Sequence, residues 1–398
     1  MNILLVSSKY PPDYSGSGNR IHNTYKRLHD KFEVNFSVIC SSTIHNFNKK
    51  FSFCDVDVYR ISNKFIIKNS ILLKIKLFVA LISRLNFWIE FLYFGFYFVK
   101  IKKKINLLHV IGKNNVTSSA IIYAKLFKVP LIVELVNSTE NPFYYQPLIF
   151  NLFYSKGFPK KSLIICISRQ LEELCKKNNI LNTWHRPNPV NEKLFNLELS
   201  DITKEELFDF KKNDIVILHL AKFIPRKNQV FLLEVMNLLP NNYKLVLAGP
   251  YEKEGLYKTR DRNNFIKLKE IEKKYNLENR VKFIPNFIDN PEIFMKCCDI
   301  FCLPSFDEGL ATPVLESLAC GKPVIASKLE TAGYLMWIKE GVNGKLIPLN
   351  YEKWARGIND IKNISKKDLV TSSINILKVA STEVIDNQYL MNIKKLIN

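Results

Sequence analysis

Two glutamates, Glu308 and Glu316, are separated by seven residues in the stretch FDEGLATPVLESLACGKPV, which runs from 306 to 324. Carboxylates can bind the hydroxyl groups of a sugar or a ribose. The backbone N–H groups of Gly309, Leu310 and a following helix can donate hydrogen bonds to a phosphate. The pattern is therefore compatible with a pocket for a nucleotide or a phosphorylated sugar. The alternative is a capped helix with two solvated glutamates.

The positions of both glutamates depend on a short helix inside this stretch. Thr312 is a favoured N-cap residue, and Pro313 suits the first helical position. Gly321, followed two residues later by a proline, is typical of a helix end. We therefore expect a helix of about two turns over 313–320, with Glu308 in the loop before it and Glu316 inside it.

Two series of short apolar segments predict the frame that holds this loop and helix. The first comprises 3–6, 34–39, 107–111, 131–135 and 163–167, and the second comprises 215–218, 245–248, 281–284, 300–303 and 323–326. Helix-length segments separate successive members, as in sheets built from alternating strands and helices. We expect an α/β fold of two tandem, doubly wound Rossmann-like domains that face each other across a cleft, with ligands beyond the carboxyl ends of the strands.

Length and composition agree with this organisation. The 398 residues suit two to three domains at about 100–200 residues each. The turn-rich segment RPNPV at 186–190 is the natural linker. The expected boundaries are 1–190 for the first domain, 191–370 for the second, and 371–398 for a helical segment that packs back toward the first domain.

The eight cysteines show no CxxC pair, and the first seven residues are too short for a signal peptide. We therefore expect a cytoplasmic chain with reduced cysteines. Cys297, Cys298 and Cys302 are interpreted as core residues, and His109 as a packed histidine. Because no His and Cys cluster has the spacing of metal ligands, neither a metal nor a cofactor is expected.

Several segments make the chain resemble the retaining glycosyltransferases of family 4, a GT-B family also called glycosyl transferases group 1. In the first domain these segments are KYPPDYSGSGNR and LLHVIG, and in the interdomain region they are CISRQLEELCKKN and RPNPVNEKLF. In the second domain they are LAKFIPRKNQ, KLVLAGP, VKFIPNF, CCDIFCLPSFDEGL and EGVNGKLIP. They cover most of the chain in the order expected for the family, and Glu308 and Glu316 match its glutamate pair.

The resemblance implies a role for each of these residues. Glu308 would contact the transferred sugar near its reacting centre, and Glu316 would bind the ribose of the nucleotide. Lys222 and Lys227 would bind the donor diphosphate, where fixed cations stabilise the charge that the leaving group gains as the glycosidic bond breaks. The other implied donor contacts are Gly16, Ser17 and Gly18, as a loop of the first domain, together with Gly309 and Leu310.

This sequence departs from the family pattern at several positions. Lys222 stands where an arginine is more common, and Met336 stands where a glutamate usually precedes the segment Gly341–Gly344. The histidine or acid that follows the 131–135 strand in the family is not evident, because Val136, Asn137 and Ser138 stand there.

The formal net charge of +21 calls for an anionic partner. Between Arg60 and Lys104 there are ten basic residues and one acid, Glu90, together with dense apolar residues. The longest uncharged run there, 91–99, has nine residues, whereas about 20 are needed to span a bilayer. We expect this segment to form either a cationic amphipathic surface that docks on anionic lipid or core helices of the first domain.

The expected activity is the transfer of a sugar from a nucleotide-diphosphate sugar to a glycan or a lipid-linked acceptor. The setting would be bacterial surface polysaccharide or lipopolysaccharide synthesis, by a metal-independent hexosyltransferase at the inner face of the membrane. A basic nucleic-acid-binding protein is one alternative, although the sequence has no helix-turn-helix, zinc or RNA-binding signature, and no nucleic acid partner is expected. A glycosyltransferase-like scaffold without catalysis is the other.

Overall fold

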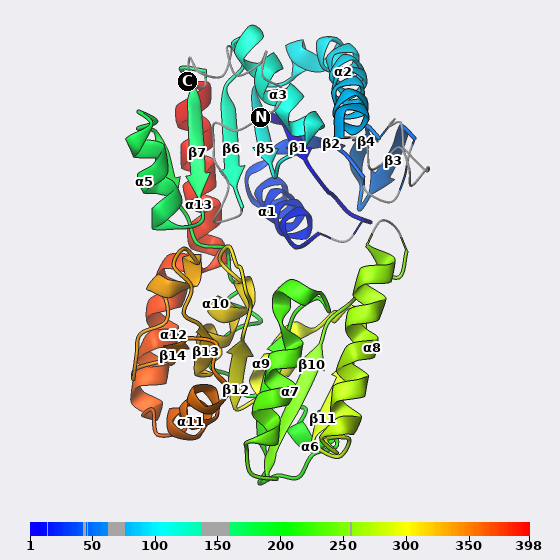
Figure 1. Ribbon diagram of the computed structural model, residues 1–398. Coiled ribbons are helices and arrows are strands. Elements are labelled where there is room, and N and C mark those ends of the chain that lie inside the picture. The colour runs from blue at the N-terminus through cyan, green and yellow to red at the C-terminus, as the bar shows by residue number, and fades with distance from the viewer. Residues whose placement is uncertain (14, 43–44, 46, 63–75, 137–158, 255–256) are drawn as a thin grey trace. The chain divides into compact units, whose positions relative to one another are not determined.

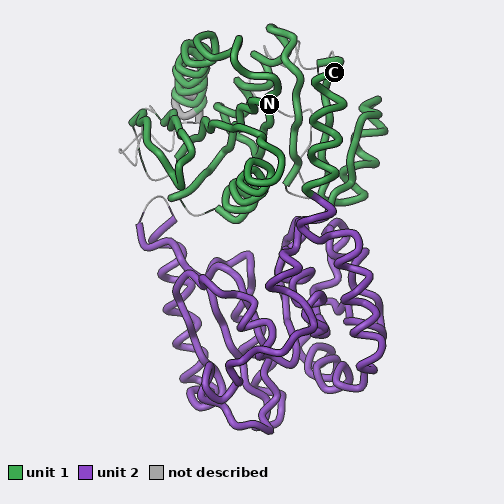
Figure 2. The backbone as a smooth tube through the Cα atoms, turned by 180° about the vertical axis from the view of Figure 1, so that it is seen from behind, with its two compact units in different colours: residues 1–186, 386–398 green, residues 187–385 purple. Residues whose placement is uncertain are grey.

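The computed structural model describes residues 1–13, 15–42, 45, 47–62, 76–136, 159–254 and 257–398. The chain forms two compact units (Figure 2): unit 1 comprises residues 1–186 and 386–398, and unit 2 comprises residues 187–385. Each unit contains one mainly parallel sheet with helices between successive strands (Figure 1). The predicted α/β class is confirmed, and the chain passes from unit 1 to unit 2 within the RPNPV segment.

The sheet of unit 1 has eight strands in the order β3-β4-β2-β1-β5-β6-β7-β8. Their bounds are β1 Asn2–Ser7, β2 Asn35–Cys40, β3 Lys49–Phe53, β4 Val56–Arg60, β5 Leu107–Ile111, β6 Leu131–Leu135, β7 Ser162–Cys166 and β8 Thr183–His185. All pairs are parallel except β3 with β4, whose connecting residues Cys54 and Asp55 both have positive φ. β5, β6 and β7 are buried along their whole length, as strands covered on both faces are.

Helices of unit 1 are α1 Gly16–Phe32, α2 Lys76–Ile101, η2 Lys102–Lys104, α3 Asn115–Leu126, α5 Arg169–Lys177 and the greater part of α13 Thr382–Ile397. The buried Asp386 on α13 accepts hydrogen bonds from Nε and Nη2 of Arg27 on α1, each at 2.8 Å. This bidentate contact fastens the end of the chain to a helix near its start. Among the described helices, none combines the length and apolar composition needed to cross a bilayer.

The sheet of unit 2 has six parallel strands in the order β11-β10-β9-β12-β13-β14. Their bounds are β9 Ile215–Leu220, β10 Tyr243–Ala248, β11 Val281–Ile284, β12 Ile300–Leu303, β13 Val324–Ser327 and β14 Gly344–Ile347. The chain runs outward from β9 to β11 and then returns to place β12 on the other side of β9. The gap between the carboxyl ends of β9 and β12 is therefore a topological switch point, the place where such sheets bind ligands.

Helices of unit 2 are α6 Lys204–Phe208, η3 Pro225–Lys227, α7 Gln229–Asn237, α8 Lys258–Lys274, α9 Pro291–Cys297, α10 Thr312–Ala319, η4 Gly333–Met336, α11 Tyr351–Ile361 and α12 Lys366–Ala380. Trp354 on α11 is fully buried and meets the ring of Phe231 on α7 edge to face at 5.2 Å between centroids. Its Nε1 donates to the Ile347 carbonyl at 3.3 Å, which ties α11 to the end of β14. The cysteines interpreted as core, Cys297, Cys298 and Cys302, are buried and free.

Candidate functional site

Two loops of unit 2 meet at the switch point between β9 and β12. The Phe306 N–H, on the loop that follows β12, donates to the Arg226 carbonyl of η3 at 3.0 Å. A second hydrogen bond joins the same loops, because Asn228 Nδ2 donates to the Pro304 carbonyl at 3.0 Å. The two loops are thus hydrogen-bonded to each other within η3 and directly after it, and they hold their side chains in one frame.

Glu308 is the buried acid of this frame, with 5% of its side chain exposed. Lys227 donates to its Oε1, Ser305 Oγ donates to the same atom at 3.0 Å, and Arg226 Nη1 lies 3.9 Å from Oε2. Burial by itself raises the pKa of Glu308, but the charges of Lys227 and Arg226 outweigh burial and hold that pKa below its usual range. Glu308 is therefore an ionised carboxylate at neutral pH.

The charges of Lys227 and Glu308 act on two neighbouring side chains, His219 and Tyr334. His219, on β9, is fully buried and its Nδ1 donates to the Cys302 carbonyl at 2.8 Å. Burial lowers the pKa of His219 to about 4, and the Lys227 charge adds to that effect, so the imidazole is neutral at pH 7. Tyr334 donates to the Ser327 carbonyl at 2.8 Å, and burial followed by the Glu308 charge raises the pKa of its phenol.

The start of α10 differs from the sequence prediction. Thr312 is already helical, and Ala311 occupies the N-cap position with a left-handed φ of 56°. Because this backbone conformation starts the helix one residue earlier, the predicted N-cap role of Thr312 is wrong, and its hydroxyl instead accepts from Asn188 Nδ2 at 2.7 Å. Within the described part of the chain, the N–H groups of Gly309 and Leu310 have no hydrogen-bond partner. They are donors available to a ligand.

Glu316 lies inside α10, as predicted. The charge of Glu292, on α9, acts on the carboxyl group of Glu316. Burial raises the pKa of Glu316 to about 7, and the Glu292 charge adds to the rise. Oε2 of Glu292 is buried with no hydrogen-bond partner among the described residues. Buried acceptors without donors are uncommon in native proteins. A ligand that offers hydroxyl groups would satisfy acceptors of this kind.

Lys222 and Lys227 both follow β9, but each holds a different carboxylate. Lys222 Nζ lies 3.2 Å from Glu252 Oε2 and 3.5 Å from Asp261 Oδ2, whereas Lys227 pairs with Glu308. Both predicted phosphate-binding ammonium groups are therefore paired with acids, and a diphosphate would have to compete with these carboxylates for them.

Gly249, at the end of β10, shapes the loop that carries Lys222. Its φ is +137°, and a Cβ there would overlap the Ala221 carbonyl oxygen. Both constraints exclude other residues from this position. The close approach brings the end of β10 against the first residues after β9.

Gly16, Ser17 and Gly18 form the first turn of α1 rather than the predicted loop. The physical reason is the N-cap: Ser15 Oγ accepts from the Gly18 N–H at 3.1 Å, which starts the helix at Gly16. A Cβ at Gly18 would lie 2.7 Å from the Lys9 carbonyl oxygen, whereas nothing lies within 4 Å of that position at Gly16.

Unit 1 contains a buried polar cluster that the sequence analysis missed. Glu134 on β6 accepts hydrogen bonds from Arg20 and Arg186 at Oε1, and from the Tyr389 hydroxyl at Oε2 at 3.2 Å. Burial by itself raises the pKa of Glu134, but the two arginines reverse the shift and hold it far below its usual range. The fully buried His109 lies 3.6 Å from Glu134 Oε2, and burial lowers its pKa.

The sequence analysis found no acid after β6, but this cluster contains an acid, Glu134, within β6 itself. A single carboxylate inside the apolar strand LIVEL was the available signal, because an acid there needs a buried partner. Val136 follows the strand, whereas Asn137 and Ser138 lie outside the described residues. Met336, at the other departure from the family pattern, ends η4.

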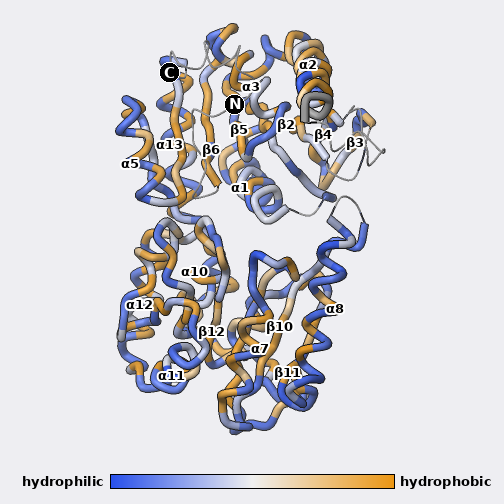
Figure 3. Tube along the Cα trace, viewed as in Figure 1, coloured by the Kyte–Doolittle hydropathy of each residue, from blue (hydrophilic) through white to orange (hydrophobic). Residues whose placement is uncertain are grey.

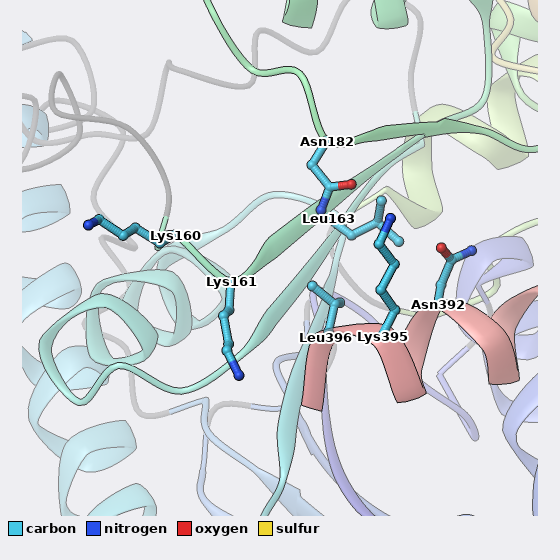
Figure 4. A pocket seen from close by; sticks show the side chains of 7 residues that line it. All are labelled: Lys160, Lys161, Leu163, Asn182, Asn392, Lys395 and Leu396. Atoms are coloured by element: carbon cyan, nitrogen blue, oxygen red, sulfur yellow. The ribbon is translucent and has the colours of Figure 1, made fainter. Parts of the chain in front are cut away.

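A pocket of about 180 Å³ lies in unit 1, away from every predicted site residue. Figure 4 shows its lining side chains, which come from the start of β7, from Asn182 and from the end of α13. Its volume is below the roughly 300–1,000 Å³ of ligand pockets. It also lies at the amino end of β7, not at the carboxyl ends of the strands. Elsewhere in the described residues, no group of three or more His, Cys, Asp or Glu side chains could hold a metal ion.

The site in unit 2 lies in the part of the chain that matches a family model. Residues 202–373 match the family model of glycosyl transferases group 1. The segment similar to glycosyl transferases group 1 thus contains the whole sheet of unit 2, both switch-point loops, and the two glutamates. All the site residues predicted for the second domain fall inside it.

Relatives with curated names support the same class of protein. Over 185 residues the chain is 29% identical to the N-acetylgalactosamine-N,N'-diacetylbacillosaminyl-diphospho-undecaprenol 4-alpha-N-acetylgalactosaminyltransferase of Campylobacter jejuni, with 46% of each chain covered. Over 147 residues it is 27% identical to the lipopolysaccharide core biosynthesis glycosyltransferase LpsE of Rhizobium meliloti, with 37% of this chain and 39% of that protein covered. The chain spans less than half the length of these curated relatives.

The likeness in structure extends further than the likeness in sequence. The solved structure of Anabaena HepE in complex with UDP matches with a TM-score of 0.72 at 18% identity, and covers 99% of this chain and 100% of HepE. At this identity the match shows the fold. The predicted GT-B fold class is therefore confirmed for the whole chain.

Proposed function

We propose that this chain is a retaining glycosyltransferase of family 4 that moves a sugar from a nucleotide-diphosphate sugar to a glycan or a lipid-linked acceptor. The observation that carries the proposal is the frame at the switch point, where Glu308 and Lys227 are in contact and the Gly309 and Leu310 amides are available. The relatives' names support a setting in lipopolysaccharide or lipid-linked sugar synthesis. The fold shared with a UDP-bound protein supports a nucleotide donor.

The donor diphosphate is proposed to bind at the carboxyl ends of β9 and β12. Negative charge develops on the diphosphate as its bond to the sugar breaks, and Lys227, Arg226 and the amides after Glu308 can stabilise that charge. Lys227 would exchange part of its contact with Glu308 for a contact with the phosphate. Because these groups supply positive charge, the proposal requires neither a metal nor a cofactor.

The two glutamates are proposed to bind the hydroxylated ends of the donor. Glu308 is ionised, so it can accept hydrogen bonds from the sugar and stabilise positive charge at the reacting carbon. Glu316 has its pKa raised to about 7, and hydrogen bonds from ribose hydroxyls would favour its charged form. Hydrogen bonds from the donor would therefore compensate Glu316 and Glu292 for the hydrogen bonds to water that burial removes.

Sugar transfer by Glu308→Gln tests the proposal, because this change keeps the shape of the side chain and removes its charge. We expect turnover to fall about 1,000-fold, equivalent to about 4 kcal/mol of barrier. Glu278→Gln, an exposed change in the same unit, should retain full turnover. Unchanged turnover in Glu308→Gln would remove Glu308 from the mechanism.

Donor binding provides a test that does not require the acceptor. A bound donor raises the melting temperature by mass action, so UDP-, GDP- and ADP-sugars can be compared directly. We expect one nucleotide class to stabilise the protein. Stabilisation without any transfer or donor hydrolysis would favour the scaffold alternative, and no stabilisation by any of them would contradict a nucleotide-sugar site.

A further inference from the structure

α2 is apolar on two faces; among the described residues, one face is buried and the other is exposed. On the covered face Phe87, Phe94 and Phe98 are buried. The rings of Phe94 and Phe98 lie 5.6 and 5.7 Å from the ring of Tyr123 on α3. Gly95 allows this close packing, because a Cβ there would overlap the Tyr123 hydroxyl. The expectation of a core helix in this segment therefore holds for this face.

The second face carries a row of large apolar side chains exposed to solvent, which we call the α2 stripe. The α2 stripe consists of Leu81, Leu85, Trp88, Leu92, Phe96 and Val99. Successive members are three or four positions apart, so they lie along one side of the helix. Their exposed fractions run from 41% for Trp88 to 66% for Phe96. Figure 3 shows that hydrophobic residues extend along most of α2.

Such a row differs from the scattered apolar residues found on every protein surface. Single exposed leucines are ordinary, but contiguous apolar surface marks a place where something binds. A helix that is hydrophobic all round is normally covered all round. The exposure of the α2 stripe therefore indicates a binding surface.

The surface beside the α2 stripe is cationic. Between 76 and 136 the sequence has nine basic residues and two acids, and both acids, Glu90 and Glu134, are buried. Lys100 Nζ lies 3.8 Å from the centre of the Phe96 ring, at one end of the stripe. η2, which follows α2 directly, consists of three lysines, of which Lys103 and Lys104 are exposed. Apolar side chains and lysines thus reach solvent together.

We propose that the α2 stripe docks on the surface of a bilayer that contains anionic lipid. An apolar row flanked by basic residues fits the boundary between acyl chains and negatively charged headgroups. Trp88 and Tyr93, both exposed, are residues that favour this boundary. Pairing of two copies through the stripe is disfavoured, because it would bring the lysines at the end of each stripe toward one another. This proposal does not rest on the proposed sugar transfer.

Co-sedimentation of the full chain with lipid vesicles tests the proposal. We expect binding to vesicles of phosphatidylcholine with a quarter phosphatidylglycerol, and at least tenfold weaker binding to phosphatidylcholine alone. Leu92→Glu with Phe96→Glu places two acids in the α2 stripe and should weaken binding to the anionic vesicles at least tenfold. The matched control is Leu181→Glu with Leu199→Glu, which changes two leucines that are more exposed than the stripe and lie outside α2.

Three further measurements make the outcome decisive. Circular dichroism and thermal unfolding establish that both double variants are folded. Stabilisation of unit 2 by a UDP-sugar is measured separately, so that a failed donor site cannot be mistaken for failed docking. Bromine-labelled lipid should quench the fluorescence of the protein, and Trp88→Leu should reduce that quenching while it retains binding. Equal sedimentation of the stripe variant and the wild type would overturn the proposal, as would a dimer in solution that the stripe variant dissociates.

Discussion

Lys227 and Glu308, 81 residues apart in the sequence, form an ion pair between the two loops of the switch point. Lys227 belongs to the loop after β9, and Glu308 to the loop after β12. The pair therefore connects the two halves of the unit 2 sheet at the edge where ligands are expected to bind. Charge balance at this position holds the pKa of a carboxylate down in a place where burial alone would raise it.

Lys227→Met should destabilise unit 2, because it leaves the Glu308 carboxylate buried with weaker compensation. Removal of one partner of a buried ion pair costs about 3–5 kcal/mol, and the remaining Ser305 and Arg226 contacts place this case at about 2–4 kcal/mol. Urea unfolding at pH 7 measures the change. The folded pKa of Glu308 is depressed, so its contribution is present above the unfolded value near 4.3 and is lost at lower pH. The difference from wild type should therefore shrink below about pH 4, and Lys267→Met, an exposed change, should show no loss at either pH.

Glu134→Gln should destabilise unit 1 strongly. The change keeps the size of the side chain but leaves Arg20 and Arg186 without their shared counter-charge in a buried site. The expected loss is about 3–5 kcal/mol in the free energy of unfolding. Fluorescence of Trp184, whose ring lies 5.0 Å from Tyr389, can follow the transition. Asp57→Asn, an exposed acid in the same sheet, is the control, and a loss no greater than that of the control would contradict the prediction.

Glu316→Gln should stabilise unit 2 at alkaline pH and weaken donor binding. The folded pKa of Glu316, about 7, lies above its unfolded value, so wild-type stability falls as pH rises from about 4.3 through 7. The amide does not titrate, and the variant should gain about 1–3 kcal/mol over wild type at pH 8 relative to pH 5. Urea unfolding at both pH values measures the gain. A parallel loss of stabilisation by the nucleotide sugar would identify Glu316 as a binding residue, and an identical pH dependence of both proteins would disprove its raised pKa.

Gly249→Ala should displace the loop after β9. The new Cβ would overlap the Ala221 carbonyl oxygen, and the φ of +137° is strained for alanine. We expect a loss of at least about 2 kcal/mol and weaker donor stabilisation in thermal shift. Gly16→Ala offers a contrast, since nothing lies within 4 Å of its Cβ position, and it should unfold like wild type or slightly later. Equal stability of Gly249→Ala and Gly16→Ala would contradict the steric argument.

The strands could be predicted where burial on both faces leaves an unbroken apolar run. All five segments expected in each sheet are strands. Val133 in β6 and Leu247 in β10 are examples of buried residues inside such runs. β3, β4, β8 and β14 could not be found in this way, because they are short and partly exposed, and all but β4 lie at the edge of a sheet. Their register depends on the neighbouring strand, which the local sequence does not contain.

The candidate site was predictable as a set of residue types but not as a set of contacts. Glu308 and Glu316 follow from a local pattern, and the structure places them in the loop and the helix expected. That Lys227 holds Glu308 while Lys222 holds Glu252 depends on chain segments up to 81 residues apart. The N-cap was misassigned because Ala311 has a left-handed backbone, which the conformational preference of alanine does not predict.

The Arg27 and Asp386 contact has a practical consequence for fragments of this protein. A piece ending at 186 would lack Asp386 and Tyr389, and would leave Arg27 and Glu134 without partners that the last helix supplies. A premature stop after 385 would thus damage the first unit. Anyone wishing to express the first unit by itself should splice 386–398 onto 1–186, for example by circular permutation.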